Sequence, residues 1–436
     1  LSNGGLTPTT VMALGLMIAG FGVKSYIVPF HTPAADAYMV APTSISMIFS
    51  GMVNKAGVYG MIRILYIIFR VMDKPSVQML IVLFGAGTMF IGVTMALTQH
   101  EFKRLLAFHS ISQIGYVITA IGLGSALGLT GGMFHAMNHT LFKGLLFLAA
   151  GAVLHETGTT DLGKLGGLSK KMPHTTVLFL IGAASISGIP PFNGFASKWL
   201  IYQATYEKAV ETNNIGFAFV TIIALITSTL TLASFVKVTQ SVFFGQLPKE
   251  CENAKEVPFG MRFAMGILAL LCVVTGLFPN AVQTYLTEPA ARTLFRVSDY
   301  INGMLGENAA QTAMGLAAPE AATIDFSKVG VWNPTNWLIL LMITLASLSI
   351  VAIASKYDSV RENKEEKVES KYSLFYGGED TVFSQVGGGD LFWGFKHNWR
   401  HYFSFMHDLH SGIVNDYSLW AVVALALAIV YALIIL

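Results

Sequence analysis

Three ionisable residues, His135, His139 and Lys143, recur at intervals of four in an apolar stretch, GGMFHAMNHTLFKGLLFLAAGAVLHE (131–156). Each residue of an α-helix turns the chain by about 100°, so steps of four return to nearly the same face. Roughly twenty apolar residues suffice to span a bilayer, and a lysine at the centre of such a span costs about 2.5–3.5 kcal/mol. The stripe should therefore face protein or water. It predicts part of a proton path; a hydrogen-bonded core histidine beside a snorkelling lysine is the structural alternative.

Three further lysines lie in apolar stretches. Lys24 precedes Pro29 by five residues, Lys198 follows the sequence GIPPFNG (188–194), and Lys55 lies well inside SGMVNKAGVYGMIR. Proline breaks a helix and frees carbonyls that need polar partners. Two interrupted helices, each with a buried lysine, are typical of repeated transporter halves. For Lys24, the alternative is a side chain that reaches the membrane surface.

Polar residues also occur in the segment LLAFHSISQIGYVITAIG, which holds His109, Ser110, Ser112 and Gln113. Hydroxyl and amide groups can hydrogen-bond neighbouring helices or hold water. We expect these four residues to have a structural role.

The composition indicates an integral membrane protein. Of 436 residues, 53% are hydrophobic and 12% are charged, whereas soluble domains are about 25% charged. The net charge of +2 and the absence of a basic patch argue against nucleic-acid binding. Cys251 and Cys272 have neither metal-ligand spacing nor a disulfide partner pattern. We expect no cofactor in this chain, so that any redox chemistry belongs to other subunits.

The hydrophobic pattern predicts an all-α polytopic membrane protein with about ten transmembrane helices, two of them broken by proline and glycine. The predicted spans are 10–28, 41–69, 77–98, 105–124, 131–154, 174–206, 216–244, 259–286, 334–355 and 415–436. We expect a membrane core over 1–290, a polar extramembrane loop over 291–333, a helix over 334–355, a charged and interfacial segment over 356–414 and a last helix over 415–436.

Positive charges on the loops predict the orientation of the chain. Alternate loops and helix ends hold one set, Arg63, Arg70, Lys74, Lys208, Arg292, Arg296 and Lys328. The others hold a larger set, Lys103, Arg104, Lys164, Lys170, Lys171, Lys249, Lys255, Lys356, Arg361, Lys364, Lys367, Lys371, Lys396 and Arg400. The positive-inside rule places the larger set, and with it segment 356–414, in the cytoplasm.

The tail carries two further features. The Gly-rich run YGGEDTVFSQVGGGD lacks the strand and the lysine of a phosphate-binding turn, which excludes nucleotide binding. The aromatic and basic stretch LFWGFKHNWRHYFSFMHDLH predicts an interfacial amphipathic helix, and its histidines are not spaced as a metal site.

Four motifs in order closely resemble one family. They are VKSYIVPFHTPAADAYMVAPTSISMIFSGMVNKAGVYGMIR, EFKRLLAFHSISQIGYV, HAMNHTLFKGLLFL and SGIPPFNGFASKW. Over about residues 10–290 the chain resembles the antiporter-like, proton-pumping subunits shared by respiratory complex I, energy-converting membrane-bound hydrogenases and Mrp antiporters.

The resemblance implies an inverted-repeat fold in which the ten helices are the family's seventh to sixteenth. It implies that Lys24 and Lys55 are the lysines of the seventh and eighth helices. His135, His139 and Lys143 correspond to the eleventh helix, and Lys198 to the broken twelfth. The family has six helices before Lys24, including a glutamate that pairs with it. We expect that partner upstream of Leu1 or in a neighbouring polypeptide, because Asp36, Asp73 and Glu101 are all expected in loops.

The chain also departs from the family around HTPAADAY, which lacks the usual tryptophan and second histidine. Because of this departure, the resemblance does not assign a role to His31 or Asp36. LFWGFKHNWRHYF (391–403) is the candidate for the lateral helix that some family members carry.

These features predict a redox-driven, proton-translocating membrane subunit without an active site of its own. Protons would pass along Lys24, Lys55, the His139 and Lys143 region and Lys198, because buried lysines release protons readily and histidine relays them. Expected partners are membrane and peripheral redox subunits, lipid and H⁺, in a prokaryotic cytoplasmic membrane. A Na⁺/H⁺ antiporter subunit of Mrp type and a structural subunit without transport remain the alternatives.

Overall fold

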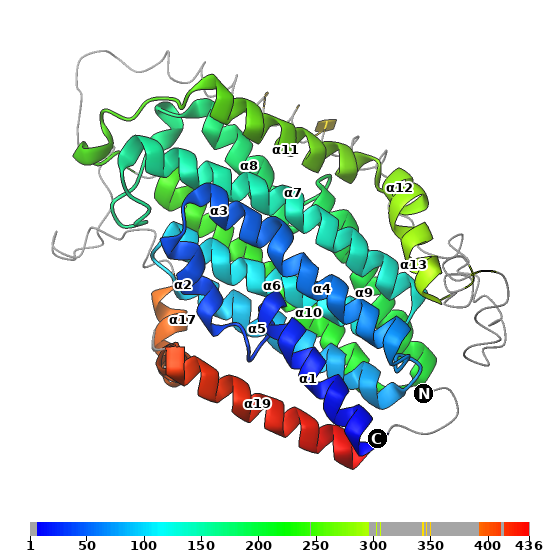
Figure 1. Cartoon of the computed structure of the whole chain (residues 1–436). Coiled ribbons are helices and arrows are strands. Elements are labelled where there is room, and N and C mark those ends of the chain that lie inside the picture. The colour runs from blue at the N-terminus through cyan, green and yellow to red at the C-terminus, as the bar shows by residue number, and fades with distance from the viewer. Residues whose placement is uncertain are drawn as a thin grey trace, which may run out of the picture.

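The computed structural model describes residues 7–244, 246–295, 392–410 and 414–435, with isolated positions at 302, 306, 342, 343, 346 and 349. The described chain forms a bundle of long helices that run roughly side by side (Figure 1). Its α-helices are α1 (Pro8–Ser25), α2 (Thr32–Val40), α3 (Thr43–Ile48), α4 (Asn54–Ile62), α5 (Pro75–Thr98), α6 (Phe102–Gly122), α7 (Ala126–Thr157), α8 (Pro173–Ser187), α9 (Asn193–Thr212), α10 (Ile215–Thr239), α11 (Phe259–Leu277), α12 (Pro279–Val282), α13 (Glu288–Phe295), α17 (Trp393–Asn398), α18 (Arg400–Leu409) and α19 (Val414–Ile435).

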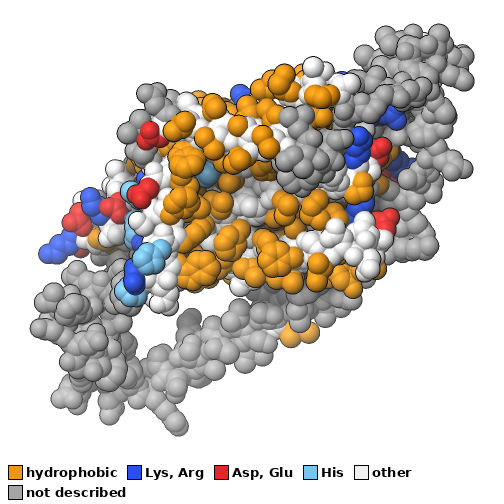
Figure 2. Space-filling view, turned by 90° about the horizontal axis from the view of Figure 1, so that it is seen from below, with side chains coloured by type: hydrophobic (Ala, Val, Ile, Leu, Met, Phe, Trp, Pro, Cys, Tyr) orange, Lys and Arg blue, Asp and Glu red, His pale blue; other side chains and the backbone are white. Residues whose placement is uncertain are grey.

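Six of the described helices are long and apolar enough to cross a membrane: α1, α5, α6, α7, α10 with its π-helical extension to Phe244, and α11. Hydrophobic side chains cover the middle of one face of the molecule, and charged side chains gather towards its two ends (Figure 2). Exposed apolar residues such as Phe219, Ile222, Phe263 and Leu270 belong to α10 and α11. This distribution fits a bundle whose outer surface meets lipid or other apolar helices.

Both predicted helix breaks are present. Helix α1 ends at Ser25, and Tyr26 follows in the left-handed region with φ of 62°. Helix α8 ends at Ser187, Gly188 takes φ of 75°, and α9 begins at Asn193. The predicted span 174–206 is thus two helices in line, separated by the Gly188–Phe192 break.

The structure corrects the prediction for the segment after the first break. The flanking Pro29 and Pro33 predict a loop at Asp36, but this residue lies in the helix α2. Pro33 occupies the first turn of α2, where its missing N–H has no helical partner to lose. Helix α11 is also shorter than the predicted span 259–286. It ends at Leu277, and a separate short helix, α12, begins at Pro279.

The centre of the bundle is α6, in which every residue except Arg104 is buried. Glycines let α5 approach it closely: a Cβ on Gly115 would lie 2.4 Å from the Met89 backbone nitrogen, and one on Gly92 would lie 2.6 Å from that of Ser112. Small residues at such contacts bring helix backbones together, as in other membrane bundles.

The described loops of the larger positive set gather at one end of the bundle. The Phe102 amide donates to the Thr160 carbonyl and the Leu162 amide to the His100 carbonyl. The Cys251 thiol lies 3.7 Å from the Lys164 carbonyl. Helix α17 also lies at this end (Figure 1). The predicted span 334–355 and the charged run 356–371 lie outside the described residues.

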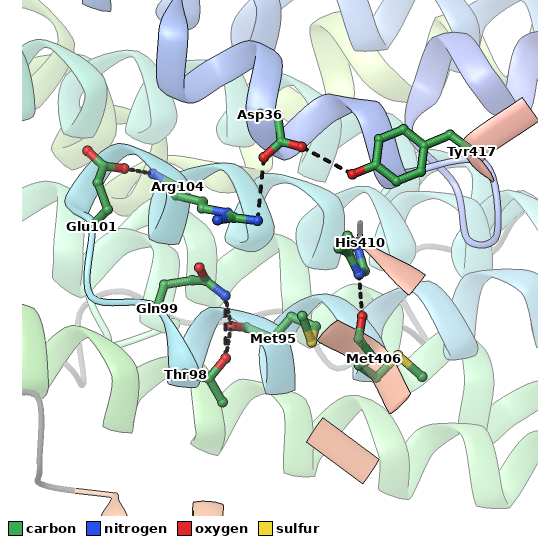
Figure 3. Close-up of polar contacts among 9 residues, drawn as sticks. All are labelled: Asp36, Met95, Thr98, Gln99, Glu101, Arg104, Met406, His410 and Tyr417. Carbon is green, nitrogen blue, oxygen red and sulfur yellow. Dashed lines mark hydrogen bonds and ion pairs between the residues drawn. The ribbon is translucent and has the colours of Figure 1, made fainter. Parts of the chain in front are cut away.

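The C-terminal helices pack on the core. Helix α19 lies alongside α1 (Figure 1), and a Cβ on Gly15 would lie 3.0 Å from Ile429 Cγ1. Asp36 accepts a hydrogen bond from the Tyr417 hydroxyl at 3.2 Å and pairs with Arg104 at 3.4 Å (Figure 3). The candidate lateral stretch is helical, as α17 and α18.

Candidate functional site

The predicted stripe on α7 is a buried feature of the bundle. His135, His139 and Lys143 are each fully buried. His135 contacts two neighbouring helices: its Nδ1 lies 2.9 Å from Ser197 Oγ of α9, and its Nε2 lies 3.1 Å from Gln113 Oε1 of α6. The stripe therefore faces protein and not lipid.

Lys55 and His139 are in direct contact. Lys55 Nζ lies 2.5 Å from His139 Nδ1 and donates to the Ser50 carbonyl at 2.5 Å. A π-helical turn over Phe49–Val53 precedes Lys55 in the chain. Such turns occur frequently at functional sites, because they re-aim side chains within a helix. The contact joins residues 84 positions apart in the chain.

The helix break in front of α9 supplies the partners of Lys198. The last carbonyls of a helix lack helical partners, and the Ile186 carbonyl at the end of α8 accepts a hydrogen bond from Lys198 Nζ at 2.8 Å. Ser228 Oγ lies 3.1 Å from the same amine, and the Tyr116 ring lies beneath it at 5.0 Å. The break thus creates a polar pocket for a lysine that is 1% exposed.

Lys143 bonds to α6. Its Nζ donates to the Leu106 carbonyl at 2.6 Å and lies 5.8 Å from the Phe147 ring centroid. The described contacts of Lys55, Lys143 and Lys198 are carbonyls, a hydroxyl, an imidazole and aromatic rings. None of the three forms an ion pair with a described carboxylate.

Several buried polar atoms among these residues have no hydrogen-bond partner within the described part of the chain. They include both amide atoms of Asn54, His139 Nε2, His109 Nδ1, Gln113 Nε2 and Asn193 Oδ1. Buried polar groups are almost always satisfied, and ordered water commonly completes them. The cluster is therefore suited to hold water between its titratable groups.

Lys24 lies apart from the buried cluster. It occupies the last turn of α1 and is exposed on the surface of the described chain. Lys24 forms no ion pair with a described residue. The predicted partner carboxylate remains a prediction.

Two basic residues join the buried set beyond the predicted residues. His109, expected to be structural, is fully buried, and its Nε2 lies 2.8 Å from Ser234 Oγ of α10. Lys237, one turn after Ser234, is also fully buried, although the sequence motifs do not single it out. Its position inside the apolar span 216–244 was the available signal.

A family model and individual relatives match this chain, and both kinds of comparison point to the same family. The family model described as NADH:quinone oxidoreductase/Mrp antiporter, TM, matches residues 2–238. Hydrogenase-4 component B of Escherichia coli is 35% identical over 291 residues, which cover 62% of this chain and 43% of that protein. A Na⁺/H⁺ antiporter subunit of Alkalihalophilus pseudofirmus is 36% identical over 366 residues, which cover 74% of this chain and 44% of that protein.

A solved structure extends the similarity to almost the whole chain. A chain of the membrane-bound sulfane sulfur reductase, an archaeal respiratory membrane complex, aligns with a TM-score of 0.68 at 26% identity. The alignment covers 96% of this chain and 68% of that one. This chain spans between 43 and 58% of the length of the first curated relatives that it matches.

Proposed function

Because this chain belongs to the NADH:quinone oxidoreductase/Mrp antiporter transmembrane family, we propose that it is a proton-translocating membrane subunit of a multisubunit, redox-driven ion pump. The observation that carries the proposal is the direct contact of Lys55, which is partly exposed, with His139, which belongs to a buried set of basic groups. Lys55 comes from α4, and the buried groups come from α6, α7, α9 and α10.

The geometry suits proton transfer between neighbouring groups. Lys55 Nζ and His139 Nδ1 are at hydrogen-bond distance, so one proton can be shared between them. Two positive charges this close repel, so protonation of one group disfavours protonation of the other. A charge displacement in a partner subunit would move the shared proton. From His139, the stripe continues to His135, and His135 contacts Ser197, the residue next to Lys198 in the chain.

Sodium transport is the second candidate, because one relative at 36% identity is a Na⁺/H⁺ antiporter subunit. Na⁺, like other hard cations, prefers oxygen ligands and carboxylates in particular. The titratable groups of the described cluster are amines and imidazoles, and no described group of three His, Cys, Asp or Glu residues is placed to hold a metal ion. These groups favour H⁺ as the transported ion.

The partners and the location are part of the same proposal. Lys24 and the exposed apolar residues Leu16 and Val23 share α1, which suits contact with a further helix that carries a carboxylate. The electron-transfer centres would belong to peripheral subunits. We place the complex in a prokaryotic cytoplasmic membrane, with segment 356–414 in the cytoplasm.

Proton pumping can be tested in everted vesicles from cells that make the complete complex, energised in turn with NADH, H₂ and formate. We expect oxidation of one of these donors to acidify the vesicle lumen, measured by quenching of an acridine dye. Lys198→Met should abolish this acidification without loss of assembled complex. Lys164→Met, in an exposed loop, is the control. Uptake of radioactive sodium in place of protons would support the antiporter alternative.

The orientation has its own test. A single cysteine introduced within the Lys356–Lys371 run should react with an impermeant maleimide in everted vesicles, where the cytoplasmic face is outside. Reaction only in right-side-out vesicles would reverse the topology.

A further inference from the structure

Lys237 is a fully buried lysine at the end of the bundle that carries the larger set of positive loops. It lies in the last turn of α10, and its Nζ donates to the carbonyls of Leu97 and Gln99, each at 2.8 Å. These carbonyls are at the C-terminal end of α5, where the helix leaves its last acceptors free. A lysine that only capped α5 would need no link to the basic cluster.

On the inner side, Ser234 is placed between Lys237 and that cluster. Ser234 lies one turn before Lys237 on α10, and residues three apart share a helix face. Ser234 Oγ lies 2.8 Å from His109 Nε2, and the other ring nitrogen, Nδ1, is buried without a described partner. His109 follows Leu106 by one turn on α6, and the Leu106 carbonyl accepts from Lys143. His109 also lies within electrostatic reach of Lys143, Lys198 and Lys237.

On the outer side, Lys237 approaches the surface of the molecule. Gln99, one of its acceptors, precedes the exposed His100. His100 Nε2 lies 3.1 Å from Lys396 Nζ of α17, and Lys396 is close enough to Lys237 for their charges to interact. Figure 3 shows Gln99, which follows α5, near Glu101, which precedes α6. Lys237 thus occupies the position between the buried cluster and an exposed histidine.

We propose that Lys237 is a proton-transfer residue that joins His109 to the surface at His100 and Lys396, so that the path opens at this end of the bundle through α10. This inference rests on the proposed function. In the transfer step, the Lys237 ammonium gives a proton to Ser234 Oγ while the Ser234 hydroxyl gives its own to His109 Nε2. No electrons are exchanged, and the neutral amine regains a proton from solvent beside His100.

The test compares substitutions that separate charge from proton release. Lys237→Arg keeps a positive charge and donors for the two carbonyls, but arginine does not deprotonate in proteins. We expect Lys237→Arg and Lys237→Met each to lower the rate of vesicle acidification by at least about tenfold per assembled complex. Lys237→His, which can exchange protons, should retain transport with a pH profile displaced to lower pH, towards the ordinary histidine range near about 6.5.

Lys103 provides a matched control. It lies at the same end of the bundle, is 6% exposed and donates to the Ala41 carbonyl at 2.9 Å, but it has no described contact with the cluster. Lys103→Arg should acidify vesicles at the wild-type rate.

Two results would overturn the inference alone: wild-type acidification by Lys237→Arg, or an unchanged pH profile in Lys237→His if the arginine variant fails to assemble. In either case Lys198→Met would still abolish transport. Absence of acidification by the wild-type complex with every donor would overturn the proposed function as well.

Discussion

At the scale of single residues, the 2.5 Å contact between Lys55 and His139 makes the two side chains one titrating unit. When two groups act as a unit, the effects of removing each of them do not add. Lys55→Met and His139→Ala should therefore each reduce proton transport by about 10²-fold or more, and the double variant should lose no more than the worse single variant. Initial acidification rates of the four proteins, normalised to assembled complex, give the comparison. Losses that multiply in the double variant would show that the two residues work separately.

Glu256, in the loop before α11, predicts a pH dependence of stability outside the membrane. Burial alone would raise the pKa of Glu256, but hydrogen bonds from the Thr175 hydroxyl and from the His174, Thr175 and Val257 amides together lower it. A lowered folded pKa stabilises the protein fully above the unfolded value of about 4.3, and this contribution is lost as the pH falls through the folded pKa.

We expect Glu256→Gln to melt a few degrees below the wild type at neutral pH, and the gap to close as the pH falls below the ordinary glutamate pKa of about 4.3. Thermal unfolding in detergent, followed by intrinsic fluorescence across this pH range, measures the gap. Glu252→Gln, an exposed neighbour in the same loop, is the control. A gap that is constant at every pH would contradict the assigned hydrogen bonds.

At the scale of elements, the break between α8 and α9 depends on close contact between its two arms. A Cβ on Gly194 would lie 1.8 Å from the Ser185 carbonyl oxygen, which cannot be accommodated without moving the backbone. Gly194→Ala should therefore lower both assembled complex and transport, although alanine in a helix normally stabilises by about 0.5–1 kcal/mol. Gly266→Ala in α11, with nothing within 4 Å, should show only the stabilisation. Equal behaviour of the two variants in blue-native gels and melting assays would refute the role of this contact.

Helical periodicity explains which elements and site residues the sequence could predict. The stripe His135, His139, Lys143 and the two breaks were accessible because helix geometry and proline chemistry are local. The helix α2 was not, since a proline is expected to break a helix, whereas Pro33 begins this one. The role of Lys237 could not be predicted either. Its partners are the Leu97 and Gln99 backbone carbonyls, 140 and 138 residues away, and no pattern of side chains in the sequence predicts these contacts.

At the scale of the whole molecule, the C-terminal helix closes the bundle against its first helix. The approach of Ile429 to Gly15 predicts that Gly15→Cys together with Ile429→Cys, in a background where Cys251 and Cys272 are serine, will form a disulfide on mild oxidation. A Leu16→Cys, Ile429→Cys pair is the control, because Leu16 is 51% exposed. A mobility shift on non-reducing gels reports the bond. Cross-linking in the control pair alone would place α19 elsewhere.

The interlocked pair of α5 and α6 has a mechanical consequence. Because Gly92 and Gly115 set these two backbones in contact, one helix cannot slide along the other without a collision at both points. Helices α5 and α6 should therefore move as one rigid unit. The arms of the α8–α9 break are also in close contact, because a Cβ on Gly194 would lie 1.8 Å from the Ser185 carbonyl oxygen. In the proposed mechanism, the groups that move are therefore side chains around these helices. In the proposed pump, protons would be passed on by side chains that change position, while α5 and α6 do not slide along each other.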